Sequence, residues 1–520
     1  MKSLNVLYEI KKELYSNNVR EYEKNKYGEV MTPLNILKDM VNMLPTRIWK
    51  NKDIKILDPS GGDGRFSIYC YELLMKNLTS ISNKTTRSIH IIENMLYVCE
   101  LNKQNVKRIT NILYKIEPDS KPNIYNVDYL KWNSNINYDI ILGNVPYNNS
   151  GGVGRVGSGS KQPIWPRFID KSLSLLKPRG YINFIHPTGW RKYYTPDGND
   201  NIGHVLYNYN ENGSILKLKM TDEKINENFP PVDYYLYQHG IIKPTQIEST
   251  FKSKKYQHKI DIHKHKFIPS IVNNESTSIL KKIFEKTNSK LNMKLNIKYH
   301  GWMQPNKSML NKSKQKNDIP YAFYYDDKIN NYQIIYENTY SKIKNDKSIK
   351  DKSKRLKRLK YVNPGKIIMT YHGSKRIGDL NAKYITGPIG SATYTMYIIP
   401  SIKYDKNMLV NFLNSKLIKF ILKLTQYSPP PRNKNEWIIL NQIDIPNLSR
   451  NVSDNDIYKY YNLTKAEIDL IEDVVTPVKK PKQQKGEAVE KAQLRTKRHH
   501  KRPRRVIRTI KKHRIKSKRK

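Results

Sequence analysis

The segment that decides the fold lies at residues 54–64 and reads IKILDPSGGDG. Its apolar start, Ile54–Leu57, predicts a short buried strand, its glycines predict a tight turn, and the following Arg65–Met75 predicts a helix. A strand, a glycine turn and a helix in this order open a nucleotide-binding α/β unit, because glycine lets the backbone approach a ligand closely. The segment lacks the G-x-G-x-x-G spacing of dinucleotide-binding proteins and the Lys-Ser/Thr pair of P-loops. Taken alone, it is equally compatible with a structural corner.

Each of the next three predicted strands also ends in a polar residue. The strands are predicted at residues 95–99, 123–128 and 138–143, and they lead to Glu100, Asp128 and Asn144. With Asp58 after the first strand, four consecutive strands therefore carry polar side chains at their carboxyl ends. Ligands of open α/β sheets bind at this edge, so the coincidence predicts a binding site for a cofactor and a substrate.

The fourth of these strand ends continues as Asn144-Val145-Pro146-Tyr147. An Asn at such an edge can accept two hydrogen bonds from an amino group, through its side-chain carbonyl and a neighbouring backbone carbonyl. The tyrosine ring beside it can stack on a flat heterocycle. The same four residues also occur in ordinary turns. The tetrapeptide indicates an active site only because three earlier strands also end in polar residues.

Composition favours a polyanionic partner. The 520 residues carry a formal net charge of +48, of which +18 lies in residues 479–520 and +30 in the rest. Nucleic acid is the first expected partner, and a membrane surface is the second. The two cysteines, Cys70 and Cys99, exclude a disulfide framework and match no zinc motif.

The predicted location is cytoplasmic, with no membrane association. The amino terminus lacks an apolar signal segment, and no uninterrupted apolar stretch is long enough to span a bilayer. The nucleus, or a viral factory or virion, remains an alternative location if the source is eukaryotic or viral. A basic run at Lys497–Arg505 could act as a nuclear import signal.

Together these motifs resemble the gamma-order amino-methyltransferases that methylate N6 of adenine in DNA, as found in restriction-modification systems. The family motif Gly-x-Val-x-Thr-Pro matches Gly28–Pro33, and a later family aromatic matches Phe229. The resemblance covers roughly residues 22–238. The family motifs Asp-Pro-x-x-Gly-x-Gly and Asn-Pro-Pro-Tyr/Phe and the family's two cofactor acids match Asp58, Pro59, Gly62, Gly64, Asn144, Pro146, Tyr147, Glu100 and Asp128. Val145 replaces the first proline of the catalytic motif.

The resemblance implies a Rossmann-like α/β domain that uses S-adenosyl-L-methionine as methyl donor and needs no metal. It implies an adenine-specific, site-specific DNA methyltransferase that acts on a base flipped out of double-stranded DNA. The implied catalytic residues are Asn144, Pro146, Tyr147 and Phe229. The implied cofactor-binding residues are Thr32, Pro33, Asp58, Pro59, Gly62, Gly64, Glu100, Asp128 and Asn144. It also leaves room for a separate restriction endonuclease as a partner.

Three domains are predicted: the methyltransferase domain at 1–245, an α+β target recognition domain at 246–473 and a disordered basic tail at 474–520. In the first, Thr32 should cap a helix at Leu34–Leu44, with Pro33 at its first position. In the second, a helix is predicted at Met408–Leu424, and Thr464 and Glu467 form a capping box for a last helix. A basic run at residues 352–360 could contact phosphates or be a solvated face. The tail should bind nucleic acid without sequence preference.

Other functions stay open. Similar catalytic motifs serve enzymes that methylate guanine N2 in ribosomal RNA or glutamine in release factors, but these usually lack the early Thr-Pro motif and a large following domain. A DNA-binding or packaging protein on an inactive methyltransferase fold is a second alternative; it should have lost Asn144 or the cofactor acids, and these are retained. A fused endonuclease is disfavoured, because no Asp…Glu-x-Lys nuclease core precedes the methyltransferase part.

Overall fold

The fold was obtained as a computed structural model. The described residues are 8–10, 12, 14, 31–148, 163–192, 204–220, 231–251, 254–265, 267–286, 298–299, 322–326, 331–335, 342, 344–346, 348, 356–358, 366–370, 380, 382–385, 395–398, 405–425, 427 and 439–476. Phe229, residues 28–30, most of the basic run at 352–360 and all of the tail beyond Thr476 lie outside them. The chain divides into two units, residues 1–475 and 476–520.

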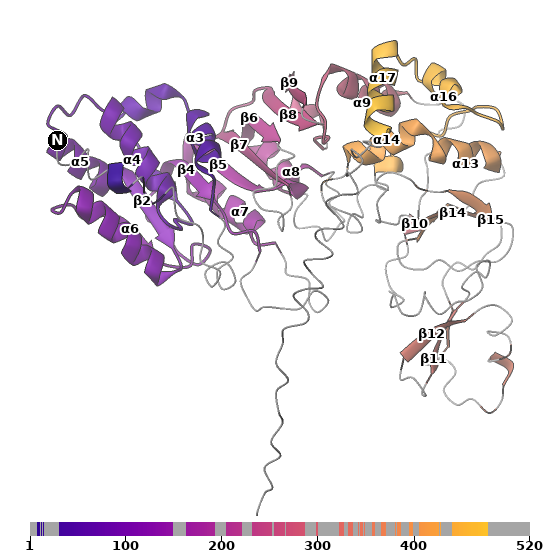
Figure 1. Ribbon diagram of the computed structural model, residues 1–520, viewed down its shortest axis with the longest axis horizontal. Helices are drawn as coiled ribbons and strands as arrows, with labels where there is room; N and C mark the ends of the chain where they lie inside the picture. The colour runs from indigo at the N-terminus through magenta and orange to yellow at the C-terminus, as the bar shows by residue number, and fades with distance from the viewer. Residues whose placement is uncertain are drawn as a thin grey trace, which may run out of the picture. The chain divides into compact units, whose positions relative to one another are not determined.

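A nine-stranded sheet forms the centre of the first part of the chain (Figure 1). The strand order is β3-β2-β1-β4-β5-β7-β6-β8-β9. Strands β1 to β5 are parallel, whereas β7 runs antiparallel to its neighbours β5 and β6. The bounds are β1 Ile56–Asp58, β2 Leu96–Glu100, β3 Asn123–Asn126, β4 Tyr138–Asn144, β5 Leu176–Pro187, β6 Gly213–Met220, β7 Val232–His239, β8 Thr245–Phe251 and β9 Lys254–Ile260.

This order confirms the predicted Rossmann-like α/β class. From β1 the chain builds outward through β2 and β3, and then returns to place β4 and β5 on the other side of β1. The topological switch point therefore lies between β1 and β4, where open α/β sheets form their ligand crevice. Strands β8 and β9 extend the sheet to Ile260, beyond residue 245, where the sequence predicts the end of the first domain.

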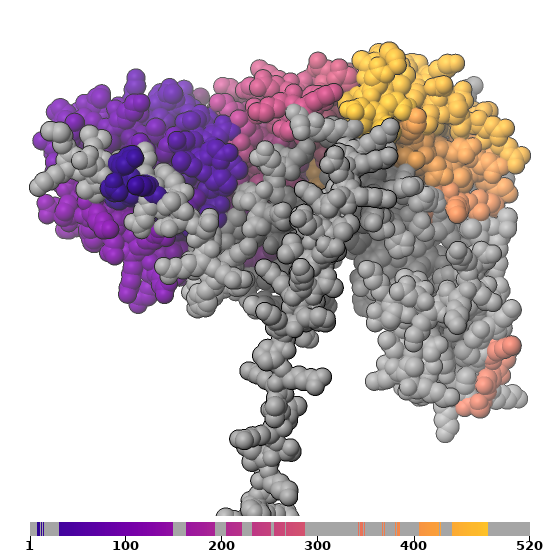
Figure 2. All heavy atoms as spheres, viewed as in Figure 1, coloured from indigo at the N-terminus to yellow at the C-terminus, as the bar shows by residue number. Residues whose placement is uncertain are grey.

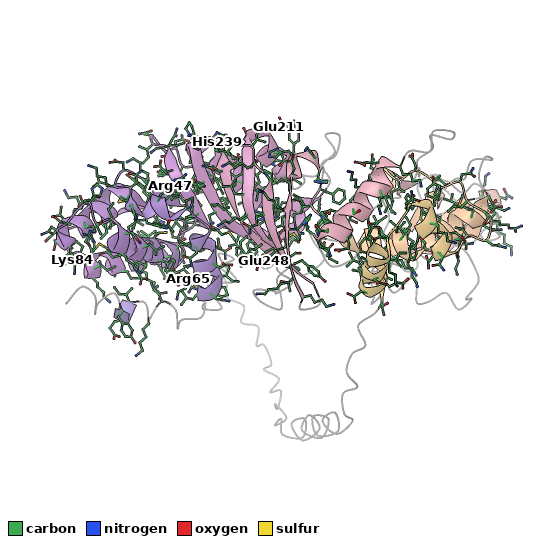
Figure 3. All side chains as sticks on the ribbon, turned by 90° about the horizontal axis from the view of Figure 1, so that it is seen from above. Arg47, Arg65, Lys84, Glu211, His239 and Glu248 are labelled. Carbon is green, nitrogen blue, oxygen red and sulfur yellow. The ribbon has the colours of Figure 1, made fainter. Side chains whose placement is uncertain are left out.

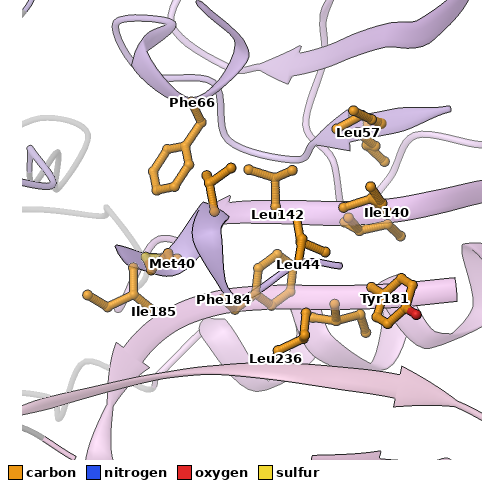
Figure 4. Packing of buried hydrophobic residues seen from close by; sticks show 14 of the residues in the cluster. Met40, Leu44, Leu57, Phe66, Ile140, Leu142, Tyr181, Phe184, Ile185 and Leu236 are labelled. Carbon is orange, nitrogen blue, oxygen red and sulfur yellow. The ribbon is translucent and has the colours of Figure 1, made fainter. Parts of the chain in front are cut away.

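Helices pack on this sheet through one large hydrophobic core. In α3, residues Leu37, Met40 and Val41 are buried at helical spacing, as an amphipathic sequence requires. Figure 4 shows Met40 and Leu44 beside Phe184 and Leu142, which project from β5 and β4. The helices are α3 Leu34–Asn42, α4 Arg65–Asn77, α5 Lys84–His90, α6 Lys103–Ile116, α7 Trp165–Leu175 and α8 His204–Asn212, with short turns η1 Thr46–Lys50, η2 Ile91–Met95, η3 Thr188–Arg191 and η4 Ile262–Lys264.

A second hydrophobic core lies in the later part of the chain and draws on residues between Phe267 and Val474. Its helices are α9 Asn274–Glu285, α13 Lys406–Asn414, α14 Lys416–Leu424, α16 Asp454–Tyr460 and α17 Lys465–Val475. The last four of them are orange to yellow in the space-filling view (Figure 2). Two small sheets belong to the same region: β10 Lys298–Tyr299, β16 Thr395–Ile398, β14 Lys366–Thr370 and β15 Lys383–Ile385 in one, and β12 Asn331–Ile335, β11 Ala322–Asp326 and β13 Leu356–Arg358 in the other.

Two local predictions were wrong. The predicted helix Met408–Leu424 is two helices, because the Ser415 side chain accepts a hydrogen bond from the Ile418 N–H and starts α14 there. Thr32 does not cap α3: Pro33 occupies the cap position, and the cap has no side-chain hydrogen bond. The predicted capping box of α17 is confirmed, because Thr464 and Glu467 exchange side-chain to backbone hydrogen bonds.

Candidate active site

A cavity of about 190 Å³ opens at the carboxyl ends of β1, β2 and β4. It lies at the switch point of the sheet, where the polar strand ends are predicted to meet. The predicted site residues that line it are Thr32, Pro59, Gly62, Glu100, Asp128, Asn144, Pro146 and Tyr147. Asp58 and Gly64 lie next to this wall in the chain but do not line the cavity, and Pro33 precedes α3 beside it. Phe229 lies outside the described residues.

The glycine turn after β1 packs tightly against β2 and α6. A Cβ on Gly61 would lie 2.4 Å from Val98 Cγ1, and the Gly61 N–H donates to the Cys99 carbonyl at 3.0 Å. Gly62 and Gly64 have positive φ angles of 54° and 88°, which side chains with a Cβ rarely adopt. Glycine is therefore required here for two different reasons, close approach and backbone conformation.

The carboxylate of Glu100 closes the turn from the side of β2. Its Oε2 accepts the Gly62 N–H at 2.7 Å, and its Oε1 accepts the Asn102 N–H at 2.6 Å. Glu100 is buried, so both of its oxygens are held by backbone N–H groups away from bulk water. The arrangement holds a carboxylate in a fixed orientation on the cavity wall.

Asp58 lies beneath the same turn and is fully enclosed. Its Oδ1 accepts the Ser60 N–H at 3.1 Å, whereas its Oδ2 has no hydrogen-bond partner among the described residues. Burial raises the pKa of Asp58 to about 7; the Ser60 N–H opposes this rise, and the nearby Glu100 and Asp63 carboxylates add to it. Near neutral pH this carboxyl group is poised to gain or lose a proton.

Asn144 ends β4 at the mouth of the cavity and is held at two atoms. Its side-chain Nδ2 donates to Thr32 Oγ1 at 3.1 Å, and its backbone carbonyl accepts the Ser60 hydroxyl at 3.0 Å. The carboxyl end of β4 is thereby tied both to the segment before α3 and to the glycine turn.

The residues after Asn144 are held mainly by packing. Val145, which replaces a proline of the family motif, is 1% exposed and belongs to the main core. Tyr147 lines the cavity with a buried ring, and burial raises the pKa of its phenol, which Asn144 partly offsets. Its carbonyl accepts the Ile164 N–H at 3.1 Å. The Val145 side chain thus packs into the core at the position of the family proline.

Asp128 is the most exposed of the predicted acids. It lies two residues beyond the end of β3, and its Oδ1 accepts the Leu130 N–H at 3.1 Å. Next to it Tyr129 is buried and stacks on Phe168, with ring centroids 5.2 Å apart. The cavity therefore has a polar corner at Asp128 beside an aromatic wall.

Asp63 and Arg65 line the cavity although the sequence motifs do not single them out. Arg65 is 6% exposed, pairs with Asp63 at 2.8 Å and donates to the Thr32 carbonyl. An Asp and an Arg flanking the last glycine of the turn are the signal that could have found them. The residues that the structure describes contain no group of side chains able to hold a metal ion and no helix long and apolar enough to cross a membrane.

Comparison with known proteins finds similarity in the middle of this region. Residues 67–225 match the family described as Eco57I restriction-modification methylase. An uncharacterized adenine-specific methylase of Mycoplasma pneumoniae is 27% identical over 168 residues, which are 30% of this chain and 36% of that protein. The chain therefore spans about a third of the length of this curated relative.

Solved structures resemble the chain only distantly. The match to a methyltransferase subunit of the type I restriction-modification system from Streptococcus thermophilus covers 45% of this chain and 51% of that subunit, with 16% identity and a TM-score of 0.31. The match to the type IIL restriction-modification enzyme MmeI, solved in complex with DNA, covers 96% of this chain and 78% of that enzyme, with 13% identity and a TM-score of 0.43.

The first part of the chain thus has the Rossmann-like fold of S-adenosylmethionine-dependent methyltransferases, and its middle resembles methylases of restriction-modification systems. The predicted resemblance to that class is confirmed. The family match includes Glu100, Asp128 and the segment Asn144–Tyr147. It begins after the glycine turn and ends before Phe229, so the roles of the individual site residues remain predictions.

Proposed function

We propose that the chain is a site-specific DNA methyltransferase that transfers a methyl group from S-adenosylmethionine to N6 of an adenine flipped out of double-stranded DNA. The observation that carries the proposal is the fixed amide of Asn144 at the mouth of the cavity, beside the ring of Tyr147. An amide oxygen there can accept a hydrogen bond from an exocyclic amino group, and the ring can contact a flat base.

The residues in the cavity wall and directly behind it fit the cofactor. Gly61 leaves no room for a side chain, the Oδ2 of Asp58 is buried without a partner among the described residues, and Glu100 presents a fixed carboxylate. In the proposal Glu100 binds ribose hydroxyls, Asp128 accepts the adenine amino group of the cofactor, and the glycine turn supports the rest. When bound, S-adenosylmethionine would supply an electrophilic methyl group, and its sulfur would keep the electron pair of the broken sulfur–methyl bond.

The residues of this chain would prepare the target nitrogen. The Asn144 side chain and the backbone carbonyl of Val145 or Pro146 accept the two amino hydrogens, which draws the nitrogen toward tetrahedral geometry and frees its lone pair. Tyr147 holds the base, and Phe229 is the proposed second aromatic contact. The nitrogen gains a methyl group and loses one proton to solvent. Because positioning and charge stabilisation supply the rate, no strong base is required.

Two further parts of the proposal concern partners. Residues 246–473 are the proposed target recognition domain, and the charge of +30 outside residues 479–520 supports binding to DNA phosphates. A separate restriction endonuclease would complete a restriction-modification pair.

The decisive experiment is expression in cells that lack adenine methylation, followed by single-molecule sequencing of their DNA. We expect N6-methyladenine at one enriched sequence motif. Asn144→Ala is the matched variant: it should lower turnover by about 10²–10³-fold or more, because it removes an acceptor that the transition state needs, while cofactor affinity stays within about threefold.

Other outcomes would contradict the proposal in distinguishable ways. Methylated RNA or release-factor glutamine, with unmodified DNA, would favour the other substrates of similar catalytic motifs. DNA binding without methylation would favour a packaging protein. Undiminished turnover by Asn144→Ala would rule out the role assigned to that residue.

A further inference from the structure

The hydroxyl of Thr32 is directed at Asn144 across 112 positions of the chain. Asn144 Nδ2 donates to Thr32 Oγ1 at 3.1 Å, and Thr32 is 2% exposed. A threonine just before a helix commonly caps it, but the cap of α3 at Pro33 has no side-chain hydrogen bond. The hydroxyl is therefore used for a contact between distant segments, inside the cavity wall.

The backbone of Thr32 is held in turn by a buried ion pair. Arg65, at the start of α4 (Figure 3), donates to the Thr32 carbonyl. Its guanidinium contacts both carboxylate oxygens of Asp63, at 3.0 and 2.8 Å, and both residues are buried. A planar, bidentate pair of this kind fixes geometry as well as charge. Thr32 is thus attached to the first turn of the helix that follows the glycine turn.

The consequence for Asn144 follows from the shape of a primary amide. The nitrogen and the oxygen are the two arms of one planar group, so a contact that holds Nδ2 also decides the side on which Oδ1 lies. An amide turned by 180° would present N–H donors to an amino group that itself donates. The Thr32 hydroxyl can accept from Nδ2 or donate to Oδ1, so it holds one end of the amide in either orientation. When it accepts from Nδ2, as it does here, Oδ1 is left for an amino group.

We infer that Thr32 is a positioning residue: its backbone carbonyl is held by Arg65, and its hydroxyl keeps the Asn144 amide in place, with Oδ1 left to accept from the amino group to be methylated. The inference rests on the proposed function. It differs from the role implied by the family resemblance, in which Thr32 binds the cofactor: a cofactor ligand affects affinity, whereas a positioning residue affects turnover when the cofactor is saturating.

The kinetic test compares Thr32→Val, which keeps the shape and removes the hydroxyl, with Thr32→Ser, which keeps the hydroxyl. At saturating S-adenosylmethionine, Thr32→Val should lower kcat about 10-fold, the size expected from removing one hydrogen bond, and Thr32→Ser should stay within about threefold of the wild type. The Kd for the cofactor, measured by calorimetry, should stay within about threefold in both. Weakened cofactor binding with normal kcat in Thr32→Val would overturn the inference, as would equal decreases of kcat in the two variants.

A structural readout separates this inference from the proposed function. Crystal structures of the wild type and Thr32→Val should show the Asn144 side chain rotated in the variant, and the wild-type orientation restored in Thr32→Ser. An Asn144 amide that keeps its orientation without the hydroxyl would overturn the inference. A wild type with no methyltransferase activity on DNA would contradict the proposed function, and the crystal structures would still decide the positioning role.

Discussion

At the scale of single residues, Asp58 is the group with the clearest dependence on pH. A carboxyl group whose pKa is about 7 in the folded protein binds a proton that the unfolded chain releases near pH 4. Its contribution to folding is therefore fully present below about pH 4, and it is lost as the pH rises through 7. Above pH 7 the folded chain carries a buried charge with one oxygen unpartnered among the described residues.

Asp58→Asn should remove this dependence while keeping an oxygen for the Ser60 N–H. Between pH 5 and pH 8 the free energy of unfolding of the cofactor-free wild type should fall relative to the variant by about 2–3 kcal/mol. Urea denaturation at both pH values measures the difference. Asp53→Asn, at an exposed position, is the matched control and should show no such trend. A constant difference between wild type and Asp58→Asn would contradict the raised pKa.

The residues that the sequence could predict are those whose signal is local. Asp58, Glu100, Asp128 and Asn144 follow strands, and parallel strands bring their carboxyl ends to one edge, so meeting there is a consequence of topology. The hydrogen bond between Thr32 and Asn144 could not be predicted in this way, because it joins segments 112 residues apart and no sequence pattern pairs them. Local spacing instead favours a helix cap at Thr32, which the structure contradicts.

At the scale of elements, the turn between β1 and α4 depends on the close approach of Gly61 to Val98. A Cβ at Gly61 would lie 2.4 Å from Val98 Cγ1, and Val98 cannot move aside easily because its branched side chain is stiff and buried. Gly61→Ala should therefore lower the free energy of unfolding by about 1–3 kcal/mol and weaken binding of S-adenosylmethionine. Denaturant unfolding and calorimetry measure the two effects.

A second substitution tests whether that clash is the cause. Val98→Ala removes the methyl groups that oppose the new Cβ, so the double variant should be more stable than the sum of the two single changes implies. Strict additivity would show that Gly61→Ala acts through the backbone and not through this clash.

The elements also show where a periodic pattern is ambiguous. The apolar positions of Met408–Leu424 continue across Ser415 on both sides, because α13 and α14 bury their apolar faces in the same core. A break between the two helices at the single residue Ser415 therefore leaves the spacing of the apolar residues almost unchanged. The serine that starts α14 is the local signal for the break.

At the scale of the whole molecule, charge is divided between the first unit and a basic carboxyl-terminal segment. Residues 1–475 form one unit, and residues 479–520 carry +18 of the total charge of +48. The first unit contains two hydrophobic cores. One consists of residues between Ile10 and Val272, and the other of residues between Phe267 and Val474. The proposed chemistry needs only the first of them, whereas choice of a DNA sequence is assigned to the second.

A chain that ends at Val475 should keep its sequence preference and bind DNA of any sequence more weakly. The removed lysines and arginines would otherwise displace counterions from phosphates, so the slope of log K against log salt should become shallower by about 0.9 for each phosphate that is no longer neutralised. A full-length variant with glutamine at these lysines and arginines is the matched control, because it keeps the length and removes the charge. Both should behave alike in filter binding over a salt series, while single-molecule sequencing reports the same methylated motif. A changed motif would show that the segment does more than attract phosphates, and an unchanged slope would show that it does not bind them.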